Sequence, residues 1–487
     1  MAVCREGFRR STPPLPHGAR SRHDPDGGVD LISALPDDML LLVLARLRCV
    51  RAAAQTSLLS RRWRGIWTGL TDLTLSDLKP SAIEAALARF NAAPTRFAAS
   101  PPVSTVNISL SERYAAHASS LLRAAVRLSA EELVFTFQRC HMAERAIIVL
   151  PYFRRATSIE LDIHSHRIDP PRECYAGSFS ALQKLSLSGN IIHLGFLLSR
   201  CPRLRVIKLT GSTTDDIMVH SATLEDLDIS TDTGCNNIDI VAPVLKILQL
   251  KFHVGWNNIR MSISTPMVEK VSWRCSYPMW AFSFGFLSLE NLAIGTKERH
   301  VHTGNDTCSQ AQQLSRFYGL HLRISATSYS SGPLNFVQEI QKLPVTNFPL
   351  LELSFIPSLH VYAALVMHLL QISWIGSSTK MLKVIHIEAQ VWSKVRETCQ
   401  GDCPCDEPKN WRSQSISLTC LEEFEITGFS AKDHEHDFLT LILRCSPTLK
   451  RVTLTLQRRE IQGPGYSTPP PHTVHTPKAR YKDADAL

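Results

Sequence analysis

The sequence has few aromatic residues and no apolar run long enough to cross a membrane. Phe, Trp and Tyr make up only 7% of its 487 residues, so we expect an aliphatic core. The most apolar stretches, 39–47 and 363–375, are much shorter than the roughly 20 residues that span a bilayer. The second is also interrupted by His368 and Gln371. We therefore expect no membrane-spanning segment and no membrane partner.

The sequence also lacks the local motifs of common catalytic and phosphate-binding sites. It contains neither a Gly-rich phosphate loop nor the Ser-centred turn of the hydrolases. Lys and Arg exceed Asp and Glu by 53 − 44 = 9, but no compact basic block accompanies this excess. Nucleic-acid binding usually concentrates such charge on one face or helix. These absences argue against an enzyme and leave nucleic-acid binding as an alternative only.

Thirteen cysteines are scattered through the chain without the dense spacing of a disulfide scaffold, so we expect reduced thiols. Cys399, Cys403 and Cys405, followed by His434 and His436, offer thiolate and imidazole groups of the kind that bind zinc. Their spacing lacks a second close pair of ligands. We therefore predict a flexible thiol-bearing loop with no metal and no cofactor, and keep a zinc site as the alternative.

The composition changes along the chain divide it into four parts. Residues 1–28 are rich in Pro, Gly, Arg and His and have no periodicity, which predicts a disordered leader. Residues 29–69 form a compact helical unit. One repeating pattern occupies 70–456, and the Pro- and Gly-rich residues 457–487 are expected to form a disordered tail.

The repeat is an apolar residue, two others, an apolar residue, one other and an apolar residue. Its clearest copies start at positions 182, 204, 224, 245, 268 and 289, a period of 20 to 23 residues. That period is typical of leucine-rich repeats. The last three residues of each copy alternate as in a short strand with one buried face. The six copies are Leu182/Leu185/Leu187, Leu204/Ile207/Leu209, Leu224/Leu227/Ile229, Leu245/Leu248/Leu250, Val268/Val271/Trp273 and Leu289/Leu292/Ile294.

Looser copies extend this pattern in both directions, with helices or loops expected in the wider gaps. Residues 191–200 and 437–444 are helical candidates, and each ends at a proline-containing turn that stops a helix. The acidic residues of 433–437 are expected to cap the second helix. The sequence thus predicts an α/β fold, with a less regular mixed domain as the alternative. Three tryptophans of the middle repeats are interpreted as core residues, with a ligand surface as the alternative: Trp256, Trp273 and Trp280.

The helical unit carries more apolar surface than so small a unit can bury. Its first helix opens with Asp37 and Asp38, whose charges suit the positive end of a helix dipole. Met39 and Leu42 widen the apolar stripe of this helix beyond one face. A unit of about 40 residues is marginal by itself, and its surplus apolar surface indicates a partner. The stripe consists of Leu40, Val43, Leu44 and Leu47.

Motifs at both ends resemble plant F-box/leucine-rich-repeat proteins with an FBD-type C-terminal segment. The F-box resemblance rests on the opening Leu35-Pro36-Asp37 and on Leu58-Leu59-Ser60-Arg61-Arg62-Trp63, with Trp67 following. One departure is Arg48-Cys49, where many members have proline. The FBD-type resemblance, within 398–456, rests on Leu421-Glu422-Glu423-Phe424-Glu425-Ile426 and Cys445-Ser446-Pro447-Thr448-Leu449-Lys450-Arg451-Val452.

The resemblance implies a three-helix F-box followed by a leucine-rich-repeat solenoid, a right-handed β-α superhelix. It implies a non-catalytic subunit of a Skp-cullin-F-box ubiquitin ligase, whose F-box binds a Skp-type adaptor and, through it, the cullin and RING subunits. The repeats would recruit an unknown protein substrate in the nucleus, the cytoplasm or both. The adaptor contacts carried over by position, with the core of the unit as the alternative for the tryptophans, are Leu35, Pro36, Leu40, Leu44, Leu47, Trp63 and Trp67.

Two other functions stay open from the sequence. The first is a repeat scaffold that binds proteins without joining a ligase. The second is a basic repeat protein that binds nucleic acid. Neither explains why an F-box-like unit precedes the repeats.

Overall fold

The computed structural model describes most of the chain between residues 32 and 456. The predicted leader 1–28 and tail 457–487, and with them Trp256, Trp280 and Cys399, lie outside the described residues. The described residues are 32, 35–92, 103–138, 145–170, 177–191, 193–211, 216–254, 260–278, 281–284, 287–300, 314–326, 335–341, 343, 345, 347–356, 361–387 and 403–456.

The N-terminal unit begins with α1 (Asp37–Arg46) and α2 (Val50–Gln55). Pro36 precedes α1 in extended backbone, and Arg48 after it has a φ of +49°. Proline cannot adopt that angle, so the turn between the two helices differs from the one that proline would make. The third α-helix predicted here is replaced by two 3-10 helices, η1 (Thr56–Leu58) and η2 (Ile66–Gly69).

A long sheet follows, in which nine strands pair in parallel, each with the next. The buried residues of the predicted repeats lie in one row: Leu185 is opposite Ile207, then Leu227, Leu248 and Val271. The repeat pattern therefore predicted the register of this sheet. The strands are β1 (Asp72–Leu75), β2 (Thr105–Ser111), β3 (Glu132–Gln138), β5 (Ser158–Asp169), β6 (Lys184–Ile191), β7 (Val206–Gly211), β9 (Asp226–Cys235), β11 (Ile247–Val254) and β13 (Lys270–Ser276).

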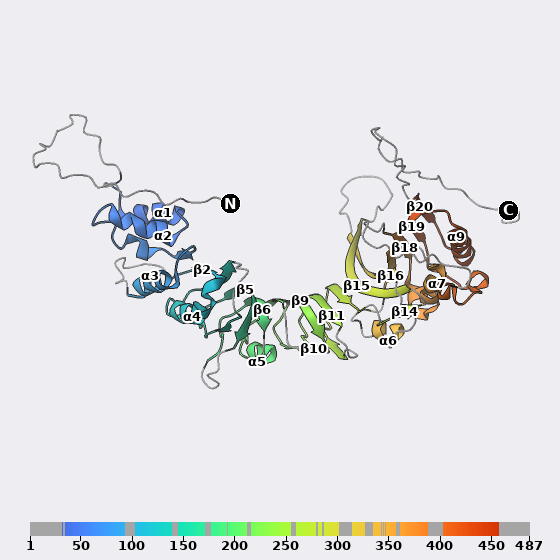
Figure 1. The fold of residues 1–487 in the computed structure, drawn as a ribbon, viewed down its shortest axis with the longest axis horizontal. Helices are drawn as coiled ribbons and strands as arrows, with labels where there is room; N and C mark the ends of the chain where they lie inside the picture. Colours follow the sequence, from blue (N-terminus) through green and yellow to red (C-terminus); the bar gives the residue numbers. More distant parts are fainter. Residues whose placement is uncertain are drawn as a thin grey trace, which may run out of the picture.

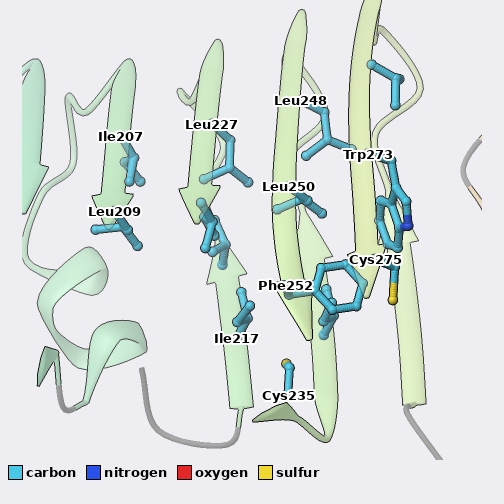
Figure 2. Close-up of a cluster of buried hydrophobic side chains, with 14 of the residues drawn as sticks. Ile207, Leu209, Ile217, Leu227, Cys235, Leu248, Leu250, Phe252, Trp273 and Cys275 are labelled. Carbon is cyan, nitrogen blue, oxygen red and sulfur yellow. The ribbon is translucent and has the colours of Figure 1, made fainter. Parts of the chain in front are cut away.

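The core runs along one face of this sheet (Figure 2). Leu227 and Leu248 are fully buried and Trp273 is 1% exposed, which confirms Trp273 as a core residue. Its ring meets Phe252 edge-on at 5.0 Å. Since each apolar row is covered by the strands beside it, stability comes from stacking of neighbouring repeats.

The sheet changes direction after β13. Strand β15 (Leu287–His300) runs antiparallel to β13 and to β16 (Leu314–Ala326), and the short β14 (Ser283–Phe284) pairs antiparallel with β15. The sixth predicted repeat is thus a strand with its apolar residues buried, but it is not a parallel repeat unit. Alternation fixes which residues face the core and says nothing about strand direction. The residues concerned are Leu289, Leu292 and Ile294.

Parallel pairing resumes from β16 to the end of the described chain. The strands are β17 (Leu350–Ile356), β18 (Met381–His386), β19 (Glu423–Phe429) and β20 (Arg451–Leu456). Figure 1 shows the whole as an elongated arc, with α1 and α2 at one end and β20 and α9 at the other. The mixed α/β class is confirmed.

The segments that return between strands cover the other side of the core. Early and late returns are helical, and the candidates 191–200 and 437–444 correspond to α5 and α9. Three middle returns form a small parallel sheet in place of helices: β8 (Asp216–His220), β10 (Asn237–Val241) and β12 (Arg260–Ser264). We did not predict this second sheet, although Ile217/Val219 and Ile238/Ile240 alternate as a strand does.

The remaining elements complete this layer. None of the helices that the structure describes is both long and apolar enough to span a membrane. The elements are α3 (Pro80–Ala92), η3 (Glu112–His117), α4 (Ala118–Val126), β4 (Ile147–Val149), α5 (Leu194–Ser199), α6 (Phe336–Gln341), α7 (Ala363–Gln371), α8 (Ser373–Ser378), η4 (Pro404–Asp406), η5 (Trp411–Ser413) and α9 (Asp433–Cys445).

Candidate protein-binding surface

Helix α1 is apolar on two sides. Leu40 and Leu44, one turn apart, are each 1% exposed and fill the core of the N-terminal unit. A second set on the same helix faces outward: Met39 is 47% exposed, Leu42 60%, Val43 49% and Leu47 43%. We call Met39, Leu42, Val43 and Leu47 the outer stripe. A helix that is apolar all round is normally covered on every side, so the outer stripe indicates a partner.

The start of α1 is fixed by an arginine that comes from the other end of the unit. The Arg62 guanidinium donates to Asp37 Oδ1 at 2.8 Å and also to the carbonyl oxygen of Leu35. Leu35 is half-buried against the core, whereas Pro36 is exposed. The motif residues on either side of α1 and α2 therefore lie together and hold Pro36 at the surface.

The two tryptophans occupy different environments. Trp67 is 3% exposed and meets Phe90 of α3 edge-on, with ring centroids 5.1 Å apart. Trp63 is half-buried and packs against the edge of the core. Gly65 between them has a φ of +93°, a left-handed angle that glycine adopts without strain. Trp67 is thus a core residue that joins the N-terminal unit to α3.

Further apolar surface follows α2. Leu58 is 88% exposed and Leu59 72%, more than any residue of the outer stripe. Leu58 also borders a groove between α2 and α3, which continues the exposed apolar surface of the unit. The groove is lined by Val50, Arg51, Ala54, Gln55, Leu58, Trp67, Leu78, Ala82, Ala85, Ala86 and Arg89.

The structure separates the residues predicted as adaptor contacts. Leu40, Leu44 and Trp67 are inside, so their side chains are not available to a partner in this structure. Pro36 and Leu47 are exposed. Sequence reasoning assigned no contact to Met39, Leu42, Val43, Leu58 or Leu59. The signal that could have found them was the width of the apolar stripe, because one face of α1 cannot bury every apolar residue that it carries.

Comparisons with known proteins agree with this arrangement. Residues 118–273 match a family described as "FBD-associated F-box protein At5g56370, LRR repeats". That match ends within β13, just before the sheet changes direction. The chain is similar to plant F-box/leucine-rich-repeat proteins. The resemblance found in the sequence, with its F-box, leucine-rich-repeat and FBD features, is confirmed.

Three curated relatives come from Arabidopsis thaliana. F-box/LRR-repeat protein At3g03360 is 49% identical over 53 residues, 11% of each chain. F-box protein At1g80960 is 26% identical over 201 residues, 40% of this chain and 38% of its own. FBD-associated F-box protein At5g60610 is 22% identical over 452 residues, 88% of this chain and 100% of its own. No solved structure matches the chain significantly.

The FBD-like part contains the residues considered for zinc. Cys403 and Cys405 are buried, and Trp411 of η5 is fully buried and donates to Asp406 Oδ1 at 2.5 Å. The prediction of a flexible loop is therefore wrong for 403–413, because this segment packs into the core. Over the residues that the structure describes, no three His, Cys, Asp or Glu side chains come together as metal ligands.

The acidic residues before α9 act as a cap, as predicted. Glu435 is 2% exposed, and its Oε2 accepts hydrogen bonds from the backbone N–H and hydroxyl of Ser430 and from the N–H of Lys432. Its other oxygen lies 3.8 Å from His386 Nε2. Burial lowers the pKa of His386 to about 4, although Glu435 opposes that shift, and burial raises the pKa of Tyr362 beside them. This cluster is structural and closes the end of the stack.

Proposed function

We propose that this chain is the substrate-recruiting subunit of a Skp-cullin-F-box ubiquitin ligase. The N-terminal unit, residues 29–69, acts as an F-box and binds a Skp-type adaptor, which links it to the cullin and RING subunits. The parallel repeats act as a leucine-rich-repeat solenoid that holds a target protein. The chain itself performs no chemistry and works by bringing target lysines close to the ubiquitin-loaded enzyme.

The observation that carries the proposal is the outer stripe on α1. Its helix is already anchored by Leu40 and Leu44, so the exposed side chains need not move before they bind. An amphipathic helix face that enters a groove on a partner is a common recognition mode. Burying one such leucine contributes about 1.5–3 kcal/mol. The stripe and Pro36 together are large enough to supply the apolar anchors of an interface.

A binding assay with the full chain and a purified Skp-type adaptor tests the proposal. We expect the double variant Leu42→Asp/Leu47→Asp to weaken binding by about a hundredfold or more, since two charges would be buried. Pro36→Ala should weaken it less. The control is Leu443→Asp on α9, an equally apolar residue that is 50% exposed. It should leave adaptor binding unchanged.

The second candidate is a repeat scaffold outside any ligase. It would be favoured if wild-type protein with an intact fold showed no affinity for any Skp-type adaptor. The proposal would also fail if Leu42→Asp/Leu47→Asp bound as tightly as the wild-type chain.

A further inference from the structure

The open face of the long sheet, opposite the leucine core, has a short basic stretch on two neighbouring strands. Lys251 of β11 and Arg274 of β13 lie directly opposite each other in the parallel register. Lys270 lies four residues before Arg274 on the same face of β13. All three side chains are exposed. We call Lys251, Lys270 and Arg274 the basic patch.

The basic patch differs from the rest of the open face in having no counter-charges. Towards the C-terminus the charged residues of this face are paired across strands: Lys383 with Glu425 at 3.1 Å, and His321 with Glu352 at 3.1 Å. Across the described part of the chain, no ion pair involves any residue of the basic patch. Like charges side by side on adjacent strands are unfavourable, so a partner that neutralises them gains free energy.

The surroundings leave the basic patch open. On one side β15 places Ala293 opposite Arg274 and Gly295 opposite Ser272. A Cβ atom on Gly295 would have nothing within 4 Å, so space lies above this strand. On the other side β9 presents the acidic residues Asp226 and Asp228. The positive charge is therefore accessible and confined to β11 and β13.

We infer that the basic patch binds an acidic peptide segment of the recruited protein. The inference rests on the proposed function, because it names the chemistry of the target. Adjacent strands lie about 4.8 Å apart, and four residues along a strand span roughly 13 Å. An extended segment along β13 with acidic residues at positions i and i+4 would place one carboxylate near Lys270. The other would lie between Lys251 and Arg274.

The same dimensions argue against nucleic acid as the occupant. Nucleic-acid binding draws its affinity from neutralising several successive phosphates. Asp226 and Asp228 lie on the neighbouring strand, and Glu352 lies on the same face beyond β16. A long polyanion laid across this face would meet these carboxylates, whereas a short acidic segment fits between them.

Binding of the full chain to a synthetic array of twelve-residue peptides tests the inference. We expect the bound peptides to be enriched in Asp and Glu at i and i+4. The best acidic peptide should bind about tenfold more weakly when Asn and Gln replace its acids, and also when Lys251→Glu/Arg274→Glu replaces the wild type. Lys251→Gln/Arg274→Gln gives a second, milder variant in case the charge reversal disturbs folding.

The matched control is Lys184→Glu/Lys208→Glu, which makes the same change in net charge on the same face at β6 and β7. It should keep near wild-type peptide affinity. The inference is overturned if the selected peptides show no acidic preference, or if both double variants behave alike. It is also overturned if mixed-sequence DNA binds through the basic patch while no acidic peptide does.

Adaptor binding, measured on the same samples, separates this inference from the proposed function. Loss of peptide binding with normal adaptor binding counts against the acidic target alone. Absence of adaptor binding with normal peptide binding counts against the ligase assignment alone.

Discussion

The N-terminal unit and the central repeats use similar leucine-rich sequences for different purposes. In β6 to β13 the inward-facing residues are covered by neighbouring strands, and Leu185, Leu227 and Leu248 are fully buried. In α1 only half of the apolar residues are covered, and Leu42 is 60% exposed. Stacking supplies a neighbour for every repeat, while a unit of two short helices has none on its outer side. The same residue type therefore stabilises one region and is left free for binding in the other.

The largest expected effect is on the stability of the repeats. Leu227→Ala should lower the free energy of unfolding by about 2–5 kcal/mol, because it leaves a cavity in a packed core. Leu42→Ala should change it by no more than about 0.5 kcal/mol, as is usual at exposed positions. Urea denaturation of the full chain, followed by circular dichroism, measures both. Equal losses for the two variants would break the comparison between the regions.

The next effect concerns pH and should act on the repeats but not on the N-terminal unit. His386 has a folded pKa of about 4, below its ordinary value of 6.5. The unfolded chain therefore takes up a proton first, and stability falls as the pH drops from about 6.5 towards 4. The loss attributable to His386 is about 3 kcal/mol at most.

Denaturation curves at pH 7, 6, 5 and 4 test this pH dependence. His386→Gln should remove its share of the loss, with Glu435, His434 and Lys432 left unchanged. Residues 29–69 contain no histidine, so adaptor binding should change little over the upper part of this range. An identical pH profile for wild type and His386→Gln would contradict the assignment.

The smallest effect is expected at the rim of the central repeats. Glu225 accepts a hydrogen bond from Arg205 Nε at 2.7 Å and lies 3.3 Å from Lys246 Nζ. These contacts lower the pKa of Glu225. Exposed ion pairs of this kind add little to stability, so Glu225→Gln should leave the denaturation midpoint unchanged within error. A clear loss would show that the rim, and not only the apolar rows, holds the repeats together.

Much of the repeat region could be predicted from local patterns. Alternation of apolar residues located the strands, and the common spacing aligned Ile207, Leu227 and Leu248 in one row. Proline-containing turns located the ends of α5 and α9. These features depend on neighbouring residues, because side-chain periodicity and caps act over a few positions. The small sheet of β8, β10 and β12 carried the same signal over segments of only five residues.

The candidate surface was harder to predict, because both sides of α1 have apolar residues. Leu40 and Leu44 were expected on the adaptor and lie in the core, while Met39, Leu42 and Val43 lie outside. The sequence by itself determined that strands recur, which of their residues face inward and that α1 has more apolar surface than its unit can cover. Only the tertiary structure decided which side of α1 is buried, that β15 runs antiparallel, and that the basic patch lacks counter-charges. The reason is that orientation, strand direction and cross-strand pairing depend on residues far apart in the chain, whereas periodicity records only a residue's near neighbours.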